Sequence, residues 1–562
     1  MNFLSEKTSI TFHETTYAYN ELRTMVNKLE QRLARLDISK ETVVAVSLHR
    51  TPMLITSLLA LLEMNVTFIP IDVNLPEKRV QNMISKAKAQ IWIHDHKSMD
   101  GLTNIDMRQD LCFEDIDIIN SIESDIAYIM CTSGTTGQPK SVLVRRAGLE
   151  NFLESVPRLI HFEQGLSISC LTSCSFDIFL LESVMATSIG LNIILADDEE
   201  AENAAYLVNL LKKANYVQMT PSKMNLIGMI DSDYECLRKV NAIMLGGEAF
   251  PESLLKTLRQ KTTAKIYNMY GPVETTIWSS IADLTQSNSV HIGYPIANTE
   301  FYILNSTHEV LPDGRIGEIA ISGAGLAAGY KDDIELTNQK FICLEDGTKV
   351  YLTGDLGKKN EDGSYSCGGR IDSQVKIRGF RVELEEIETC ITQCFPNTLA
   401  ACVFDEKNKQ LISFYTGDNS VTSAEFNSVL AQHLPYYMIP NRYIKVDEIK
   451  HTTSYKIDRK AMLSLFSKME EENSSNNNCE AENTLDIYET IAEVIECDAK
   501  IVDYGVKIAD IGIDSIKLIM LIVALEEKYN ISFEDKMLSR NAFYYCGEIF
   551  DYVNELVSKK EN

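Results

Sequence analysis

The sequence predicts an α/β fold, in which helices alternate with the strands of largely parallel sheets. Apolar residues recur at helical spacing in residues 19–36 and 53–62. Short apolar runs of strand type follow these two stretches, at residues 41–49 and 66–72. With 562 residues, of which 45% are hydrophobic and 24% charged, the chain can bury large cores and form several domains.

The alternation continues to about residue 300, and the composition then changes three times. Residues 301–369 are rich in strand patterns and glycine, and a smaller mixed segment follows. Residues 467–483 are polar and without periodicity, which is typical of a flexible linker. The remainder is a small, acidic helical unit. We therefore expect an N-terminal core over 1–372, a small α+β segment over 373–466, a linker over 467–484 and an all-α domain over 485–562.

The net charge of −27 disfavours nucleic acids and anionic membranes as partners, since both would be repelled. The thirteen cysteines form no CxxC pair and have no metal-ligand spacing with histidine, so reduced thiols are expected. The N-terminus shows no apolar signal-peptide core, and the longest apolar runs are too short to span a bilayer. These observations predict a cytoplasmic protein without a membrane partner.

The stretch CTSGTTGQPKS, residues 131–141, follows an apolar strand-like run and suits phosphate binding. Glycines allow close backbone approach, hydroxyls donate hydrogen bonds and a lysine adds charge. The stretch is not a Walker A loop, because Pro139 stands where that pattern requires glycine. A polar surface turn is the alternative interpretation. The predicted phosphate-binding residues are Thr132, Ser133, Gly134, Thr135, Thr136, Gly137 and Lys140.

Further short motifs follow in a fixed order: SFDIF at 175–179, YGPVETT at 270–276, YLTGDLG at 351–357 and TSYKIDRKAM at 453–462. In this order the chain resembles the adenylate-forming superfamily, most closely the amino-acid adenylation domains of non-ribosomal peptide synthetases. The resemblance covers essentially the whole chain. DIGIDSIKL, at 510–518, resembles a peptidyl carrier protein. The resemblance implies a large α/β N-terminal part with a β-rich subdomain, a small C-terminal lid and a four-helix carrier.

The resemblance implies two half-reactions: an amino acid and ATP form aminoacyl-AMP, and a phosphopantetheine thiol then displaces AMP. Lys456 would bridge the substrate carboxylate and the α-phosphate, and Glu274 would hold Mg²⁺. Asp372 would be the pivot of the lid. Asp355 would accept the ribose hydroxyls, beside Arg370. The other implied ATP-binding residues, around the adenine and the phosphates, are Gly247, Glu248, Ala249, Asn268, Tyr270, Gly271 and Thr275.

Asp177 lies where the family places the carboxylate that pairs with the substrate α-amine, which favours an amino acid over a fatty or aryl acid. Bulky side chains of the implied pocket, Trp278 above all, leave little free volume and would reject larger substrates by overlap. We therefore expect glycine, with alanine or another small amino acid as the alternative. The implied lining consists of Asp177, Ile178, Leu181, Gln218, Met244, Gly246, Met269, Ile277 and Trp278, closed by Lys456.

Ser515 follows Asp514 at the expected start of an apolar helix over 516–528, where the helix dipole favours a phosphodiester. The resemblance makes it the attachment site of 4′-phosphopantetheine, and a plain N-cap serine is the alternative. A phosphopantetheinyl transferase is then an expected partner, as is a downstream condensing or tailoring enzyme. Whether a small activator protein is required stays open.

The chain departs from the family pattern at Ser141, Arg146, Glu385, Tyr455 and Ile513. Tyr455 adds bulk beside Lys456, where the family has glycine. Because the chemically essential residue types are present, activity is expected. Two other functions remain open at this point: an acyl-CoA ligase that uses free CoA, and a weakly active scaffold that binds ATP and presents the carrier.

Overall fold

The computed structural model describes residues 3–109, 124–133, 139–202, 204–372, 374–377, 379–396, 398–406, 410–417, 421–451, 457–476, 487–492, 515–533 and 545–561, with isolated positions between the last ranges. The chain divides into two compact units, which we describe separately. The first comprises Met1–Asp198, Leu210–Met224 and Tyr234–Glu386, and the second Glu199–Asn209, Asn225–Asp233 and Ile387–Asn562.

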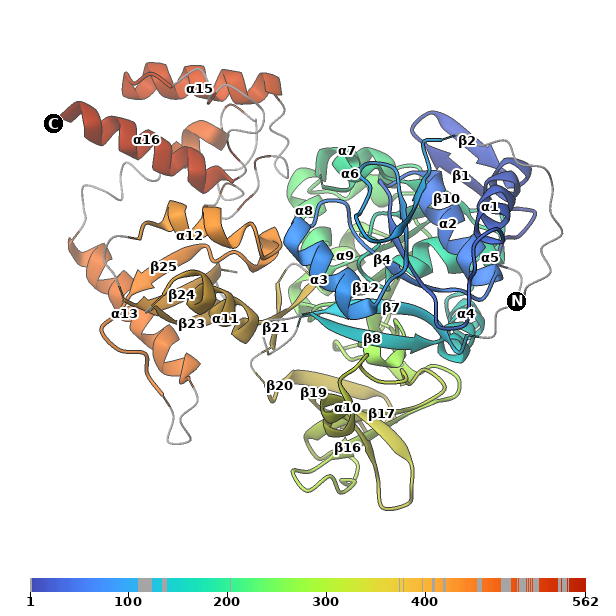
Figure 1. Cartoon of the computed structure of the whole chain (residues 1–562). Coiled ribbons are helices and arrows are strands. Elements are labelled where there is room, and N and C mark those ends of the chain that lie inside the picture. The colour runs from blue at the N-terminus through green and yellow to red at the C-terminus, as the bar shows by residue number, and fades with distance from the viewer. Residues whose placement is uncertain are drawn as a thin grey trace. The chain divides into compact units, whose positions relative to one another are not determined.

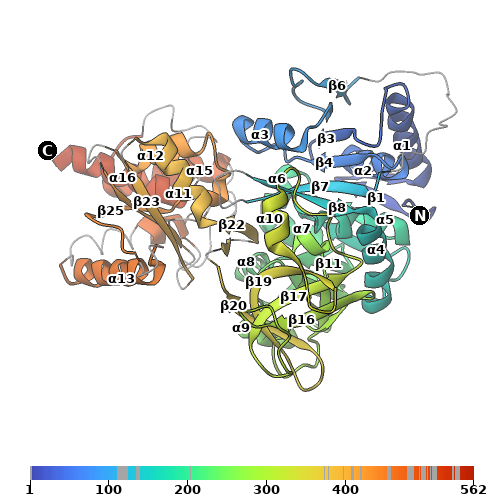
Figure 2. The same ribbon diagram turned by 60° about the horizontal axis from the view of Figure 1, so that its bottom comes forward.

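A six-stranded sheet forms one part of the first unit, in the order β6-β5-β3-β4-β7-β8 (Figure 2). Its neighbouring strands are parallel except for the antiparallel pair β7 and β8. All five residues of β3 are buried, as expected of a parallel strand covered on both faces. The strands are β3 (Val43–Ser47), β4 (Thr67–Pro70), β5 (Ile91–His94), β6 (Thr103–Asp106), β7 (Ile126–Thr132) and β8 (Lys140–Arg145).

A nine-stranded sheet has the order β15-β14-β13-β12-β11-β9-β10-β1-β2 and is parallel from β13 to β1. Val44 and Phe68 of the first sheet share one hydrophobic core with Ile168 and Ile193 of this one. The strands are β1 (Ser9–Phe12), β2 (Thr15–Ala18), β9 (Ser167–Cys170), β10 (Asn192–Leu195), β11 (Tyr216–Met219), β12 (Ala242–Gly246), β13 (Lys265–Tyr270), β14 (Ser280–Asp283) and β15 (Tyr294–Pro295).

Helices connect the parallel strands, as the alternating pattern predicts (Figure 1). The two helices expected over 19–36 and 53–62 are α1 (Tyr19–Leu33) and α2 (Pro52–Glu63). Pro52 occupies the first turn of α2, where its missing N–H costs nothing. The others are α3 (Glu77–Ala87), α4 (Arg146–Ile160), α5 (Ala186–Ile189), α6 (Asp198–Glu202), α7 (Ala204–Leu211), α8 (Pro221–Ile230) and α9 (Glu252–Lys261).

The β-rich subdomain expected over 301–369 is a five-stranded antiparallel sheet. It comprises β16 (Thr299–Leu304), β17 (Gly317–Gly323), β18 (Phe341–Cys343), β19 (Lys349–Lys359) and β20 (Tyr365–Arg370), with helix α10 (Ile334–Lys340). A two-stranded hairpin follows, made of β21 (Gln374–Ile377) and β22 (Phe380–Glu383). This hairpin belongs to the first unit. The α/β fold with a β-rich subdomain is confirmed.

The second unit contains a three-stranded sheet in the order β23-β24-β25, and two long helices of the region predicted to be all-α. Helix α13 continues to Asn476, so the first part of the predicted linker is helical; its lysine and glutamates favour that state. The elements are α11 (Leu384–Cys394), β23 (Leu399–Asp405), β24 (Gln410–Thr416), α12 (Ser423–Leu430), β25 (Arg442–Lys445), α13 (Arg459–Asn476), α15 (Ser515–Tyr529) and α16 (Cys546–Glu561).

Among the described helices, none combines the length and the hydrophobicity needed to cross a bilayer.

Candidate active site

Asp177 lies in a buried turn after β9, and only 4% of it is exposed. Its Oδ2 accepts a hydrogen bond from the backbone N–H of Ile277 at 3.1 Å. Burial raises the pKa of Asp177 to about 7, although the hydrogen bond from Ile277 partly offsets this, and the charge of Glu274 adds to the rise. A cationic group beside this carboxyl would favour its ionised form.

The backbone that presents the Ile277 N–H is strained. Thr276 and Ile277 have φ angles of 66° and 65°, a region that β-branched residues rarely adopt. The hydroxyl of Thr276 donates to the carbonyl of Gly325 at 2.7 Å, and the hydroxyls of Thr275 and Ser279 lie 2.6 Å apart. These buried bonds hold the chain in a conformation that it would otherwise leave.

Trp278 is held in place by a chain of buried hydrogen bonds. Its Nε1 donates to Gln218 Oε1 at 3.0 Å. The amide nitrogen of Gln218 donates to Glu182 Oε1 at 2.9 Å and to the carbonyl of Ile178 at 3.2 Å. Glu182, which is fully buried on a π-helical turn, also accepts from the N–H of Leu171 at 2.7 Å. The orientation of the indole is therefore set by groups behind it.

Gly246 ends strand β12 directly against Trp278 and Met269. A Cβ atom at this position would lie 2.6 Å from Trp278 Cη2 and 2.5 Å from the carbonyl oxygen of Met269, so only glycine fits without a shift. In the same sheet, Met244 pairs with Gln218 in register. Hydrogen bonds and close packing thus join seven of the predicted pocket residues: Asp177, Ile178, Gln218, Gly246, Met269, Ile277 and Trp278.

Asp355 on β19 lies between a tyrosine and an arginine. Tyr270 OH donates to its Oδ2 at 2.7 Å, and Arg370 Nη1 donates to its Oδ1 at 2.6 Å. Burial raises the pKa of Tyr270 well above its usual value, and the charge of Asp355 adds to this, so the phenol stays a hydrogen-bond donor. The amide of Asn268, two residues before Tyr270, donates to the carbonyl of His291 at 2.8 Å.

Arg370 also holds Asp372, the predicted pivot. Arg370 Nε donates to Asp372 Oδ1 at 2.6 Å and Nη2 to Oδ2 at 2.8 Å. Burial opposes ionisation of Asp372, but its bonds to Arg370 outweigh that and keep its pKa below the usual value. One guanidinium therefore binds both predicted carboxylates, Asp355 and Asp372.

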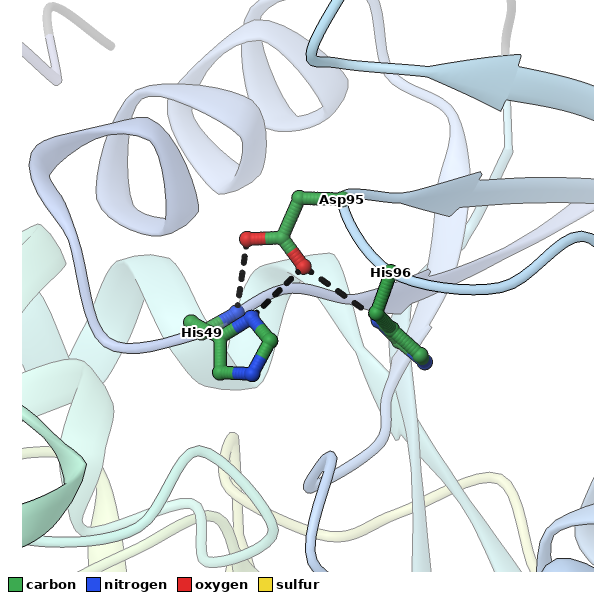
Figure 3. Close-up of side chains that lie close together, drawn as sticks. All are labelled: His49, Asp95 and His96. Carbon is green, nitrogen blue, oxygen red and sulfur yellow. Dashed lines mark hydrogen bonds and ion pairs between the residues drawn. The ribbon is translucent and has the colours of Figure 1, made fainter.

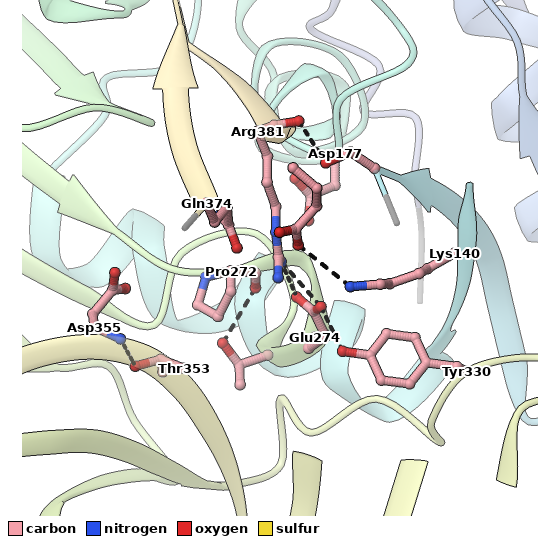
Figure 4. Close-up of polar contacts among 12 residues, drawn as sticks. Lys140, Asp177, Pro272, Glu274, Tyr330, Thr353, Asp355, Gln374 and Arg381 are labelled. Carbon is pink, nitrogen blue, oxygen red and sulfur yellow. Dashed lines mark hydrogen bonds and ion pairs between the residues drawn. The ribbon is translucent and has the colours of Figure 1, made fainter. Parts of the chain in front are cut away.

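Glu274, the predicted Mg²⁺ ligand, is completely buried, and its carboxylate contacts Arg381 and Tyr330 (Figure 4). Arg381 Nη1 lies 3.0 and 2.9 Å from its two carboxylate oxygens, and Tyr330 OH donates to Oε1 at 2.8 Å. Burial opposes ionisation, but the charge of Arg381 and the bond from Tyr330 hold the pKa of Glu274 below its usual value. An ionised oxygen donor suits Mg²⁺. In this conformation, both carboxylate oxygens of Glu274 that could bind Mg²⁺ accept hydrogen bonds from Arg381.

The described ends of the phosphate loop meet the same hairpin. Lys140 Nζ lies 3.3 Å from Glu383 Oε1, and the hydroxyl of Ser133 donates to the carbonyl of Arg381 at 2.8 Å. Thr132 Oγ1 is buried, and no described residue forms a hydrogen bond with it. Such an unsatisfied hydroxyl at the edge of a phosphate loop fits a ligand that would complete it. On the neighbouring turn, Glu248 Oε2 accepts from the N–H of Ser222 at 3.1 Å.

Some predicted residues cannot be placed. Gly134, Thr135, Thr136, Gly137 and Lys456 lie outside the described residues. Helix α15 begins at Ser515, the residue expected at its N-terminus.

Sequence reasoning did not single out Arg381, Glu383, Tyr330 and Glu182, although all four contact predicted site residues. The cation-rich run around β22 was a signal for Arg381. Nothing in the sequence pattern separates Glu182 or Tyr330 from other polar residues near apolar runs, because their partners are distant in the chain.

Comparison with known proteins gives the family of the chain. Residues 2–331 match the family model described as AMP-binding enzyme, and residues 486–542 match the one described as phosphopantetheine attachment site. Bacitracin synthase 3 of Bacillus licheniformis is 32% identical over 474 residues, which cover 81% of this chain and 7% of that protein. The chain thus spans a small fraction of this curated relative.

Two solved structures are similar. A four-domain nonribosomal peptide synthetase bound to AMP and glycine is 27% identical, with a TM-score of 0.60, covering 97% of this chain and 41% of that one. A nonribosomal peptide synthetase protein containing adenylation and carrier domains, bound to a vinylsulfonamide inhibitor, matches in fold, with a TM-score of 0.72 and 22% identity; the match covers 98% of this chain and 95% of that chain.

The family matches together define an AMP-binding enzyme domain joined to a phosphopantetheine attachment domain. The chain belongs to the AMP-binding enzyme family, whose model covers more than half of its length.

Proposed function

We propose that this chain activates a small amino acid, glycine in the first place, as aminoacyl-AMP and loads it as a thioester onto its own carrier domain. The observation that carries the proposal is the buried Asp177 beside the hydrogen-bonded wall of Gln218 and Trp278. Asp177 supplies the charge that an α-ammonium group needs, and Trp278 fills the space that a larger side chain would require. The glycine-bound relative, at 27% identity, supports the choice of glycine.

Each charged residue has a defined task in this proposal. Asp355 accepts hydrogen bonds from the ribose, and Tyr270 and the turn at 246–249 enclose the adenine. Lys140 and the hydroxyls of the phosphate loop bind the phosphates. Lys456 brings its charge to the substrate carboxylate and the α-phosphate, which repel each other without it. Glu274 would hold Mg²⁺, which neutralises phosphate charge when bound.

The hairpin β21–β22 must withdraw its arginine before Glu274 can accept a cation, since Arg381 contacts both oxygens. Asp372 lies two residues before strand β21, which supports its proposed role as the pivot. We therefore propose that movement about Asp372 exchanges the hairpin for the Lys456 segment between the two half-reactions. The proposal includes the predicted domain boundaries: the N-terminal core ends at about residue 372, the lid at about 466 and the linker at about 484.

Ser515, at the start of the 15-residue helix α15, would carry 4′-phosphopantetheine. A phosphopantetheinyl transferase is thus a required partner, and the loaded carrier would serve a downstream condensing or tailoring enzyme. Incubation with CoA and such a transferase should add one arm, detected by mass spectrometry. Ser515→Ala should remain unmodified. An added arm in this variant would show that the arm is attached at another residue.

The decisive experiment is amino-acid-dependent pyrophosphate exchange with each of the twenty amino acids. Glycine should give the highest rate, with alanine next. Exchange stimulated by large amino acids alone would contradict the pocket assignment, and no exchange with any of them would favour the ATP-binding scaffold. Product formed on free CoA, with none on Ser515, would favour the acyl-CoA ligase.

A further inference from the structure

A cluster of two histidines and one aspartate lies outside the candidate active site (Figure 3). His49 follows strand β3, and Asp95 and His96 follow strand β5. These two strands are parallel neighbours, with Ser47 opposite His94. The cluster therefore lies at the carboxyl ends of parallel strands, where α/β sheets commonly bind ligands.

The potential ligand atoms of the cluster lie about as close together as ligands that share one metal ion, and hydrogen bonds now join them. His49 Nδ1 is 2.9 Å and His96 Nδ1 is 3.2 Å from the same oxygen, Asp95 Oδ1. With metal–ligand bonds of about 2.0–2.2 Å, neighbouring ligands of a tetrahedral centre lie about 3.3 Å apart. The three ligand atoms also lie within 4.8 Å of one another. A small movement of the side chains would admit an ion between them.

The carboxylate is already oriented toward both rings. Asp95 Oδ2 accepts a hydrogen bond from the backbone N–H of His49 at 3.1 Å. This bond holds the Asp95 side chain against the loop that carries His49. Figure 3 shows the two imidazoles on either side of this carboxylate. The His49 side chain is 50% exposed and that of His96 is 29% exposed, so an ion can reach them from solvent.

A third histidine lies beside the cluster. His94, the last residue of β5, is only 2% exposed, and neither of its ring nitrogens has a hydrogen-bond partner in the part of the chain that the structure describes. Its ring centre is 6.1 Å from that of His96 and 6.5 Å from that of Trp92, on which it stacks. A buried imidazole without a partner is uncommon, and here it adjoins the partly exposed imidazole of His96.

We propose that His49, Asp95 and His96 bind a first-row divalent transition-metal ion, with Zn²⁺ as the physiological example. Two imidazoles and one carboxylate suit Zn²⁺, Co²⁺ or Ni²⁺, whereas Mg²⁺ and Ca²⁺ prefer oxygen ligands alone. The ion would tie the loops after β3 and β5 together, and would leave one coordination position for water or for His94.

The test is a calorimetric titration of the chelator-treated full chain with Zn²⁺, after alkylation of accessible thiols such as Cys343 and Cys367. We expect one site that Asp95→Asn and His96→Ala each weaken by at least about tenfold. The matched control is His308→Asn, which removes an exposed imidazole from a turn in the β-rich subdomain, where asparagine tolerates the positive φ. This control should bind Zn²⁺ as the unmodified chain does.

A second measurement needs no variant. Diethyl pyrocarbonate modifies accessible histidines, and mass spectrometry locates the products. Zn²⁺ should protect His49 and His96 and leave His308 as reactive as before. Equal Zn²⁺ affinity in all variants, or equal modification of His49 and His96 with and without Zn²⁺, would overturn the proposal. Neither readout depends on adenylation activity, so failure here leaves the proposed function untouched.

Discussion

The indole Nε1 of Trp278 donates to the amide oxygen of Gln218 over 3.0 Å, and both side chains are buried. Gln218 is in turn fixed by Glu182. The wall of the proposed pocket is thus a hydrogen-bonded unit, and a substitution there changes both the shape of the wall and the satisfaction of its polar groups.

Trp278→Phe should shift the preference of the pocket from glycine toward alanine. The smaller ring frees space for a methyl group, whose fit is worth about 1–3 kcal/mol. The ratio of pyrophosphate-exchange efficiencies for alanine and glycine, measured as kcat/KM, should rise at least about tenfold. Trp92→Phe is the matched control: Trp92 is equally buried and donates to the Lys97 carbonyl at 2.9 Å, but it lies in the other sheet. An unchanged ratio in Trp278→Phe would contradict the pocket assignment.

Amino-acid binding should weaken as the pH falls below 7. The pKa of Asp177 is about 7 in the free protein, so the carboxyl is mostly protonated at lower pH and cannot pair with an α-ammonium group. The KM for the amino acid should rise about tenfold per pH unit well below that pKa. The rate at saturating substrate should change less, because substrate binding restores the ionised form. In Asp177→Asn, KM should be high throughout, and a pH profile like that of the unmodified chain would argue against this role.

Arg381→Ala should destabilise the first unit by about 3–5 kcal/mol, because it leaves the buried Glu274 carboxylate without its cation. Both tryptophans lie in this unit, so their fluorescence in urea reports its unfolding. The control is Arg238→Ala, whose pair with Glu235 is exposed and should contribute less than about 1 kcal/mol.

The double variant Glu274→Gln/Arg381→Met should recover most of the stability lost in Arg381→Ala, since neither position then carries a charge. Equal losses of unfolding free energy in Arg381→Ala and Arg238→Ala would show that the buried pair stabilises this unit no more than an exposed pair does.

Lys456→Ala should abolish pyrophosphate exchange while ATP binding, followed by calorimetry, stays largely intact. The reason is that the lysine charge is needed when two anionic groups approach each other, whereas the nucleotide has other contacts. Lys460→Ala removes an exposed lysine from the same region and should retain exchange. Exchange at the normal rate in Lys456→Ala would refute the proposed role.

The α/β alternation could be predicted because each element carries its own periodicity. Residues 53–62 are apolar on all sides and form the buried helix α2, and residues 41–49 contain the buried strand β3. The contacts around Asp355 were also accessible in outline, since Tyr270 and Arg370 belong to motifs that the resemblance places together.

The contacts of the hairpin could not be predicted in the same way. Arg381 and Glu274 are 107 residues apart, and a pairing over that distance depends on where the hairpin rests rather than on local pattern. The helical extension of α13 into polar residues was missed for a related reason, because helix propensity without an apolar face leaves no periodic signal.

Arg370 joins Asp355, the proposed ribose acceptor, to Asp372, the proposed pivot, through a single guanidinium. Ribose hydroxyls that donate to Asp355 would share its oxygens with Arg370, and would thereby affect the contact between Arg370 and Asp372. Binding of a nucleotide would then affect the proposed pivot, Asp372, through the single side chain of Arg370.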